Sequence, residues 1–496
     1  MSTIALVRSD KSATRVPTEA TASPLEKLRS FLETHRMAGK IGPRAFADFE
    51  AELHARLMGF EREVIASEMK SIDVDVPAIV IDGKVHRRVL RQWQTYMTAA
   101  GEVQVERTLY KDRSDSEGRT VSPMELTLGM IGDFWTPRAA QQALWVVTQM
   151  TPQKGEALFE RMGNQDPSKS SLDRLPKLLS ERWEDNREAF EKALRDGLEI
   201  PEGTVSIGVS LDGVLAPIDG GNSPAAVRAE AAADGRMCKG PAGYRETGCA
   251  TVSFCDEKGD LLGAIRMARA PESKKATLKD MLTAEVRAVL ATRPDLKLIK
   301  VADGAADNWQ YLSSSALPKG EEAIDFFHAG EHLHVAIAAA YGDATRETTF
   351  RYESLRETLR DEPDGADKVI RALKHLATKH PQRTAIAREL AYFRKHKKRM
   401  QYARLKAAGY TIGSGIVEAA CKTLVTQRLK QSGMRWSVGG AQAILTPRGW
   451  DQSERFDQAW ALLAATFHTE VFVLANVLAF KPKRPERPKR ARATSR

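Results

Sequence analysis

Cysteine is scarce in this sequence of 496 residues, and its four cysteines form no C-x-x-C pair. Cys238, Cys249, Cys255 and Cys421 therefore argue against a disulfide framework and against a thiolate zinc site. Long apolar runs are also lacking, because the run at 471–480, VFVLANVLAF, is too short to cross a bilayer. The first residues lack the apolar segment of a secretory signal, so we expect a cytoplasmic protein without membrane contact.

Positive charge is in excess, with a net charge of +10, and it is placed unevenly. The segment 481–496, KPKRPERPKRARATSR, holds eight Lys or Arg residues and one Glu. Its three prolines favour an extended, disordered tail. We interpret this tail as a sequence-independent phosphate binder for nucleic acid. The alternative is a solubilising end.

The first two hundred residues divide into two parts. Residues 1–23 are polar and rich in Ser and Thr, and we expect them to be disordered. The region 24–200 has mainly helical apolar spacing. It also contains two short extended patches, near 78–90 and 102–111. We expect a mainly helical N-terminal region for DNA binding or dimerisation.

A series of short helices is expected near 136–183. Thr136-Pro137 and Thr151-Pro152 each combine a cap with a residue preset for the first helical turn. Short helices with tight turns suit a helix-turn-helix DNA reader, with Lys169 and Arg174 on its reading helix. An ordinary helical bundle fits the same spacing.

From about residue 203 the pattern changes to an α/β one. Three apolar strand-like runs are followed by an amphipathic helix and two further strands, which predicts a mixed α/β sheet. The segment 329–408 has a helical and strongly charged pattern. The segment 409–445 begins with a Gly-Ser-Gly turn that leads into a helix, and 446–480 is expected to be a C-terminal helix.

Two aspartates come directly after apolar strands in this region. Asp212 ends the run VSIGVSLD, and Asp303 is next after LKLIKVA. Each is followed by glycine, so turn chemistry explains either of them alone. If the two strands are neighbours, however, both carboxylates meet at one edge of the sheet.

Glu418 is the third acidic candidate. It lies about one turn after Gly413-Ser414-Gly415, where Ser414 can cap the helix. An ion pair with Lys422, four residues later, is the alternative to a ligand role. Two Asp and one Glu are hard oxygen donors, the set preferred by Mg²⁺ or Mn²⁺. A pair of such ions can activate a water or a 3′-hydroxyl for phosphodiester chemistry.

The helix after Glu418 is rich in cations. We expect its side chains to line a groove for a polyanion, with an aromatic ring available for base stacking. These candidate DNA-binding residues are Lys422, Arg428, Lys430, Arg435 and Trp436.

Four stretches also resemble a known family. They are SLDGV, VADGAADNW, DFFHAGEHL and the long segment beginning YTIGSGIVEAACKTLVTQRLKQSGMRW. Together they are similar to the transposases of bacterial ISKra-type insertion sequences, which belong to the DDE group with an RNase H-like catalytic core. The resemblance covers about 120–445 and is densest at 409–445.

The resemblance implies a DNA transposase that cleaves element ends and joins them to target DNA. It implies that Asp212, Asp303 and Glu418 form a catalytic triad binding two Mg²⁺ or Mn²⁺ ions. His328 would assist at the phosphate, since Asp325 and His328 match a D-x-x-H motif. The core would comprise 203–328 and 409–445, with 329–408 as a helical insertion.

The same resemblance implies the partners of the chain. These are double-stranded DNA, namely terminal inverted repeats and target DNA, and further copies of the chain in a homodimer or larger assembly. It also implies a bacterial, nucleoid-associated location. Relatives often carry a Cys-rich zinc element where this chain has LYKDRSDSEGRT, which contains no cysteine. End recognition is therefore expected from the helical series.

Three rival functions fit parts of the sequence. His328, Glu331 and His332 form an H-x-x-E-H pattern, which is the signature of inverted zinc peptidases, with Glu389 or Glu418 as a third ligand. That hypothesis leaves both aspartates and the basic segments unexplained. The others are an RNase H-like nuclease without strand transfer and a non-catalytic DNA-binding repressor.

Overall fold

The computed structural model describes residues 23–37, 43–112, 114, 118–219, 232–233 and 243–473. The expected disordered segment 1–23, except its last residue, and the basic tail 481–496 lie outside these residues. The chain forms two compact units. The first comprises 1–140, 157–167 and 465–496, and the second comprises 141–156 and 168–464.

The first unit contains a sheet that the sequence only partly predicted. Its strands are β1 (Ala78–Ile81), β2 (Lys84–Thr98), β3 (Gly101–Asp112) and β11 (Phe472–Val473), all paired antiparallel in the order β11-β1-β2-β3. Its helices are α1 (Pro24–Met37), α2 (Pro43–Ile72) and α3 (Pro123–Leu128). The region is thus less helical than expected, because Tyr96, Val103 and Val105 bury one face of a long hairpin against Met69 of α2.

Four helices come next along the chain. They are α4 (Pro137–Gln149), α5 (Pro152–Met162), α6 (Lys169–Asp185) and α7 (Arg187–Asp196). Helices α4 and α5 begin at the prolines that the Thr-Pro pairs predicted. Pro176 lies inside α6 without ending it. Leu172 and Trp183 lie on the buried face of α6, whereas Lys169 and Arg174 are exposed.

The second unit is built on a mixed sheet of five strands, so the chain is a mixed α/β protein. The strand order is β7-β6-β4-β8-β9. The strands are β4 (Ser206–Ala216), β6 (Arg245–Cys255), β7 (Leu261–Arg269), β8 (Lys297–Ala302) and β9 (Glu321–Ile324). β6 is antiparallel to both β4 and β7, whereas β8 is parallel to β4 and to β9. A short parallel pair joins β5 (Ile218–Asp219) to β10 (Trp436–Ser437).

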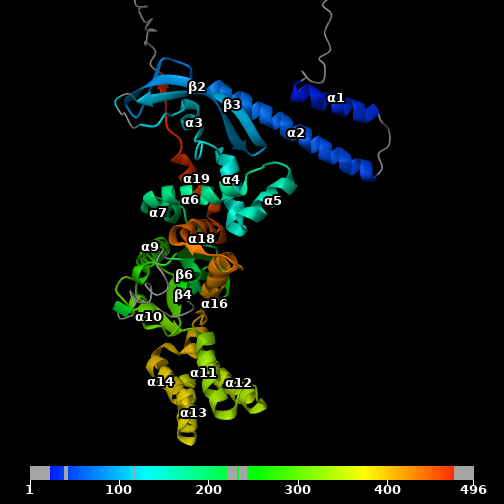
Figure 1. The fold of residues 1–496 in the computed structure, drawn as a ribbon. Helices are drawn as coiled ribbons and strands as arrows, with labels where there is room; N and C mark the ends of the chain where they lie inside the picture. Colours follow the sequence, from blue (N-terminus) through cyan, green and yellow to red (C-terminus); the bar gives the residue numbers. More distant parts are fainter. Residues whose placement is uncertain are drawn as a thin grey trace, which may run out of the picture. The chain divides into compact units, whose positions relative to one another are not determined.

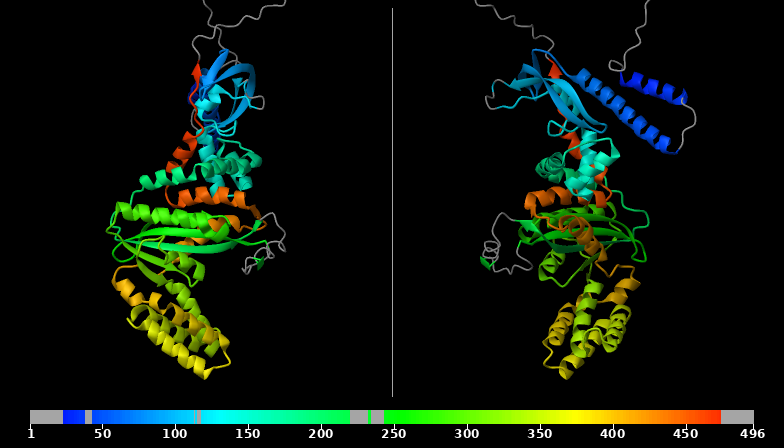
Figure 2. Two further views of the ribbon diagram at one scale, coloured as in Figure 1. Left: turned by 90° about the vertical axis from the view of Figure 1, so that its left-hand side faces the viewer. Right: turned by 45° about the vertical axis from the view of Figure 1, so that its right-hand side comes forward.

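Successive side chains along β4 point to opposite faces of this sheet. Ile207, Val209 and Leu211 belong to the main hydrophobic core, which also contains the apolar side chains of α9 (Ala276–Thr292). Figure 2 shows α9 across this face. Asp212 has the opposite parity, so its side chain belongs to the other face.

The helices of this unit enclose the sheet and extend from it (Figure 1). Besides α9 they are η1 (Ser273–Lys275), α10 (Ala306–Leu312), α11 (Phe326–Tyr341), α12 (Arg346–Asp361), α13 (Gly365–Lys379), α14 (Thr384–His396), η2 (Lys397–Arg399) and α15 (Tyr402–Ala407). The expected helical segment 329–408 is thus helical, and α11, α12, α13 and α14 pack on one another.

The last helices depart from the expectation in two ways. The helix after the Gly-Ser-Gly turn is α16 (Gly415–Ala420), which continues as a π-helical turn (Cys421–Thr426) and α17 (Gln427–Leu429). The expected helix over 446–480 is wrong as one element. Up to residue 473 it comprises the end of α18 (Val438–Gln452), then α19 (Phe456–Ala465) and the strand β11, and 474–480 lie outside the described residues. The described helices include none that is both long and apolar enough for a membrane span.

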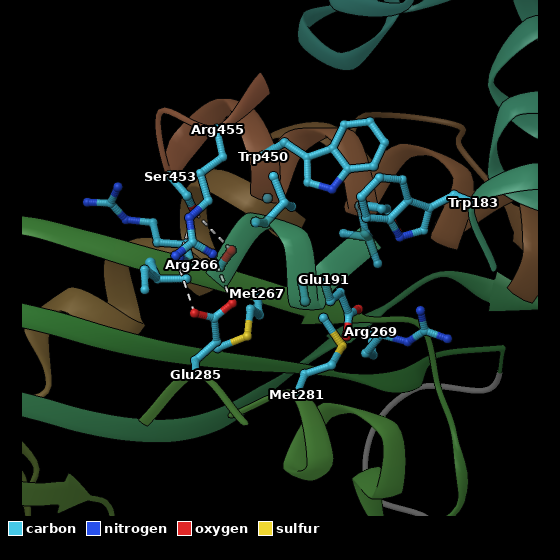
Figure 3. Close-up of a pocket in the computed structure, with 16 residues that line it drawn as sticks. Trp183, Glu191, Arg266, Met267, Arg269, Met281, Glu285, Trp450, Ser453 and Arg455 are labelled. Atoms are coloured by element: carbon cyan, nitrogen blue, oxygen red, sulfur yellow. Dashed lines mark hydrogen bonds and ion pairs between the residues drawn. The ribbon is translucent and has the colours of Figure 1, made fainter. Parts of the chain in front are cut away.

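A small cavity of roughly 50 Å³ lies on the α9 side of the sheet, lined by residues of β7, α9 and α18 (Figure 3). Arg455 closes one end of it with a bidentate ion pair to Glu285, with nitrogen–oxygen distances of 2.8 and 3.2 Å. Glu191 of α7 also lines the cavity, and burial raises the pKa of its carboxyl group to about 7. The Arg455–Glu285 pair thus connects the residue before α19 with α9.

Glu191→Gln is expected to stabilise the protein at neutral pH. The folded protein holds the Glu191 proton up to about pH 7, whereas the unfolded chain releases it near its ordinary pKa of about 4.3, so wild-type stability falls across that window. The variant should gain about 3 to 4 kcal/mol above pH 7 and nothing below pH 4. Urea unfolding between pH 4 and 8 measures the difference, and a gap independent of pH would contradict the assignment.

Candidate active site

Asp212 lies inside β4, not at its end. The strand continues to Ala216, and Asp212 and Gly213 remain in register with Cys249 and Gly248 of β6. The turn interpretation of this Asp-Gly pair is therefore wrong. Asp212 is half-buried, and its Oδ1 accepts a hydrogen bond of 2.7 Å from the backbone N–H of Gly213. A carboxylate is thus built into the central strand of the sheet.

The register between parallel strands sets Asp212 beside Asp303. Ser206 pairs with Lys297 and Val209 with Lys300, and the same register continued along both strands brings residue 212 level with residue 303. Level positions on adjacent parallel strands project to the same face. This register sets the two acids level on one face of the sheet, with Asp212 inside β4 and Asp303 just after β8.

A third aspartate belongs to the same row. β8 pairs with β9 so that Ala302 lies opposite Ile324, which brings Asp325 level with Asp303. The backbone N–H of Asp325 donates to the Ala302 carbonyl at 2.8 Å, which confirms the continued register. Sequence reasoning placed Asp325 at a strand end but missed its place in this row. The strand before Asp325 is indicated only by the short run AIDFF, and so brief a run does not reveal which strand it pairs with.

Asn308 fixes the spacing between the first two acids. Its Nδ2 donates to the Leu211 carbonyl at 3.1 Å and to Asp303 Oδ1 at 3.2 Å. Asp303 Oδ1 also accepts from the backbone N–H of Ala305 at 3.1 Å. One buried amide therefore connects β4 with the loop that carries the second carboxylate.

Asp325 connects the strand edge to the third acid. Its side chain is fully buried, and Oδ1 accepts from the backbone N–H of His328 at 2.6 Å, which caps α11. Oδ2 accepts a hydrogen bond from the backbone N–H of Ser414. Ser414 was expected to cap α16 with its hydroxyl, but it forms no such bond. The Gly-Ser-Gly turn is instead held from outside, by the Asp325 carboxylate.

Glu418 lies on α16, directly after this turn. Burial raises the pKa of Glu418, and the nearby Asp325 and Asp212 carboxylates raise it further, whereas His328 lowers it. The alternative ion pair with Lys422 is not formed among the described residues. The structure therefore brings Glu418, His328 and the aspartate row into one electrostatic cluster.

The pKa of Asp212 is raised for the same reasons as that of Glu418. Burial raises the pKa of Asp212, and repulsion from Asp303 adds to it. Its Oδ2 lies 3.7 Å from the Cys421 Sγ at the start of the π-helical turn. Lys275 Nζ reaches only the backbone carbonyl of Asp212, at 3.4 Å, and pairs with Glu246 at 2.9 Å. The negative charge of the cluster is therefore poorly compensated by the protein.

The donor chemistry of this cluster fits a divalent cation. Asp212, Asp303 and Glu418 offer carboxylate oxygens, and the pKa values of Asp212 and Glu418 are raised by burial first and then by repulsion between carboxylates, which a cation would relieve. Their side chains do not converge as a set of ligands. Within the described ranges, no group of three His, Cys, Asp or Glu side chains is arranged to hold a metal.

The H-x-x-E-H pattern has a different arrangement from the one a zinc peptidase needs. The His328 and His332 rings meet edge-on, with centroids 4.9 Å apart. Glu389, a suggested third ligand, instead forms a hydrogen bond of 2.5 Å with Nδ1 of His332. His328 Nδ1 lies 3.3 Å from Glu331. The motif thus joins α11 to α14, which does not support the peptidase hypothesis.

One of the predicted DNA contacts is not available. Arg428 is only 1% exposed, and its guanidinium donates to the Val147 carbonyl at 3.2 and 3.1 Å. Burial lowers the pKa of Arg428 to about 10. Its guanidinium carbon lies 5.0 Å from the centroid of the Trp436 ring, and Trp436 Nε1 donates to the Leu429 carbonyl at 3.1 Å. Arg428 is therefore structural, and Trp436 is half-buried against it.

The remaining cations predicted to contact DNA are exposed. They are Lys422, Lys430 and Arg435, and Lys169 and Arg174 on α6. Arg174 donates to the Ser170 carbonyl at 3.2 Å, so it lies along its own helix. Their role in DNA binding stays a prediction.

Compared with known protein families and with curated proteins, the chain matches none. The functional assignment therefore depends on the geometry of the site.

Asp325→Ala should destabilise the second unit by about 3 kcal/mol, because two buried backbone N–H groups lose their acceptor. Asp307→Ala is the matched control, since Asp307 is an exposed acid in the first turn of α10. Denaturant unfolding measures both. An Asp325→Ala midpoint equal to that of the control would show that the carboxylate does not hold the Gly-Ser-Gly turn.

Proposed function

We propose that this chain is a DNA transposase of the DDE group, acting through an RNase H-like core. The observation that carries the proposal is the continued parallel register, which sets Asp212 beside Asp303 while Glu418 is electrostatically coupled to Asp212. Asp212 and Asp303 are half-buried and Glu418 is exposed, and placing the two half-buried like charges side by side is costly because they repel. Such a cost is typical of functional sites.

The architecture of the second unit supports the same assignment. Three antiparallel strands are extended by two parallel ones, and the central strand β4 carries the first acid. The second acid comes directly after the adjacent strand β8, and a helix packed near β4 and β6 carries the third. The helices over 329–408 interrupt the chain between the second and third acids.

The residues of the site would have distinct roles. Asp212, Asp303 and Glu418 would hold Mg²⁺ or Mn²⁺ ions, which supply activation of a water or 3′-hydroxyl and neutralise charge on the phosphate. Asn308 and Asp325 position the carboxylates through the hydrogen bonds given above. His328 lies near Glu418 and can donate to a phosphate oxygen.

The substrate under this proposal is double-stranded DNA carrying the terminal inverted repeats of the element, and then target DNA. Water attack releases a 3′-hydroxyl, which then attacks a phosphodiester of the target. Two ends must be held together for joining, so we propose a homodimer or a larger assembly. The exposed cations Lys422, Lys430 and Arg435 are the proposed phosphate contacts beside the site.

Asp212→Asn, Asp303→Asn and Glu418→Gln should each reduce cleavage by roughly 10³-fold or more, because each removes one carboxylate of the cluster. DNA affinity should change little. Asp307→Asn, four residues after Asp303 and exposed, is the control and should cleave normally. The assay uses labelled DNA from the element ends with Mg²⁺ or Mn²⁺, with binding measured in Ca²⁺.

Joining is scored with the same DNA supplied as a pre-cleaved 3′-hydroxyl end together with plasmid target. Joined products support a transposase, whereas cleavage without joining identifies a nuclease. Undiminished cleavage by any of the three variants would remove that residue from the site. Binding of end DNA without cleavage by the wild type would indicate the repressor.

Lys430→Ala combined with Arg435→Ala should weaken DNA binding and reduce the slope of log affinity against log salt by about 1–2, since each phosphate contact releases about one counterion. Arg428→Ala should leave that slope unchanged and lower thermal stability, because its guanidinium is buried and bonded to Val147. Anisotropy titrations over a series of salt concentrations measure the slopes, and thermal unfolding measures the stability. A reduced slope for Arg428→Ala would contradict its structural role.

A further inference from the structure

His332 and the buried Glu389 form a carboxylate–imidazole pair that the proposed chemistry has not used. His332 Nδ1 and Glu389 Oε2 are 2.5 Å apart, and the Glu389 side chain is 3% exposed. The other oxygen of Glu389 accepts from Arg388 Nε at 2.7 Å. A carboxylate oxygen accepts hydrogen bonds, so Nδ1–H of His332 donates to Glu389.

The pair leaves the second ring nitrogen of His332 available. The His332 side chain is 28% exposed, and no hydrogen bond to its Nε2 is formed within the described part of the chain. A carboxylate that fixes one nitrogen and orients the ring toward a reaction partner is a recurring arrangement in enzymes. Structural histidines instead tend to have both nitrogens satisfied.

The neighbours of His332 place it beside the candidate active site. Its ring stacks on Tyr392, with centroids 3.7 Å apart. Tyr392 in turn lies against Gly304, the residue after Asp303, so closely that a Cβ at Gly304 would collide with the ring. His332 also forms an edge-to-face contact with His328, whose charge acts on Glu418. His332 is thus linked through Tyr392 to the residue after Asp303, and through His328 to the surroundings of Glu418.

We propose that His332 binds a phosphate group of the DNA strand next to the cleavage position, donating from Nε2–H to a non-bridging oxygen, with Glu389 as its positioning residue. This inference rests on the proposed function, because it assumes that DNA occupies the acidic site. It gives the H-x-x-E-H pattern a role. The second histidine contacts the DNA strand, and α14 of the helical insertion supplies Glu389, its hydrogen-bond partner.

The charges around the pair favour this role. An imidazole between a carboxylate and a phosphate can donate to both only when both nitrogens carry protons, and such charge-assisted bonds are among the stronger ones. His396, which also faces Tyr392, is a poor alternative, because burial lowers its pKa to about 4. Arg388 is occupied by Glu389.

A scan with single methylphosphonates tests the contact. Each DNA substrate replaces one phosphate near the cleavage position with a neutral group, and binding in Ca²⁺ and cleavage in Mg²⁺ are measured. For the wild type, one position should weaken binding by about tenfold. His332→Gln should lose about the same factor on unmodified DNA and become insensitive to that position. Glu389→Gln should give a smaller loss at the same position.

His334→Gln is the matched control, since His334 lies on the same helix and packs on Tyr352 instead. It should keep the wild-type profile. A profile for His332→Gln that matches the wild type overturns the inference, as does a wild-type scan without a sensitive position, which requires no variant to fold.

The phosphate contact and the catalytic proposal fail in different ways. If cleavage depends on Asp212 and yet is unchanged by His332→Gln and by every methylphosphonate, that result contradicts the phosphate contact and supports the transposase proposal. If binding is sensitive to one methylphosphonate position only when His332 is present, but no DNA is cleaved, the contact is supported and the catalytic proposal is contradicted.

Discussion

The parallel pairing of β4, β8 and β9 is the constraint on which the site depends. Because the register is continuous, three aspartates at positions 212, 303 and 325 form one row on the face opposite α9. A slip of one residue in β8 would move Asp303 to the α9 face and replace it with an apolar residue. The parallel pairs that β8 forms with β4 on one side and β9 on the other fix its register.

The row divides into two kinds of carboxylate. Asp325 is fully buried and accepts from two backbone N–H groups, so its role is structural. Asp212 has a raised pKa, as does Glu418, because burial and like charges are incompletely offset. Asp325 thus holds the Gly-Ser-Gly turn in place. Asp212 and Glu418 keep an unfavourable electrostatic energy that a bound substrate or ion would reduce.

Sequence patterns predicted the acids and most of the elements, but not how the chain connects them. Apolar runs identified β4 and β8, and the Thr-Pro pairs identified the starts of α4 and α5, since these signals are local. The role of Asp325 depends on pairing between distant strands, which no local spacing reveals. Arg428 was mistaken for a surface cation, because nothing in its neighbourhood indicates that Val147, far away in sequence, accepts its hydrogen bonds.

The π-helical turn between Cys421 and Thr426 affects how the last helix presents its side chains. Each residue of an α-helix advances by about 100° around the axis, so a single wide turn changes the phase between the helical segments on its two sides. Glu418 lies before this break, and Arg428 lies after it. Deleting one residue within the turn would change this phase, and Glu418 and the Arg428 guanidinium, which is bonded to Val147 of α4, could then no longer both keep their present positions.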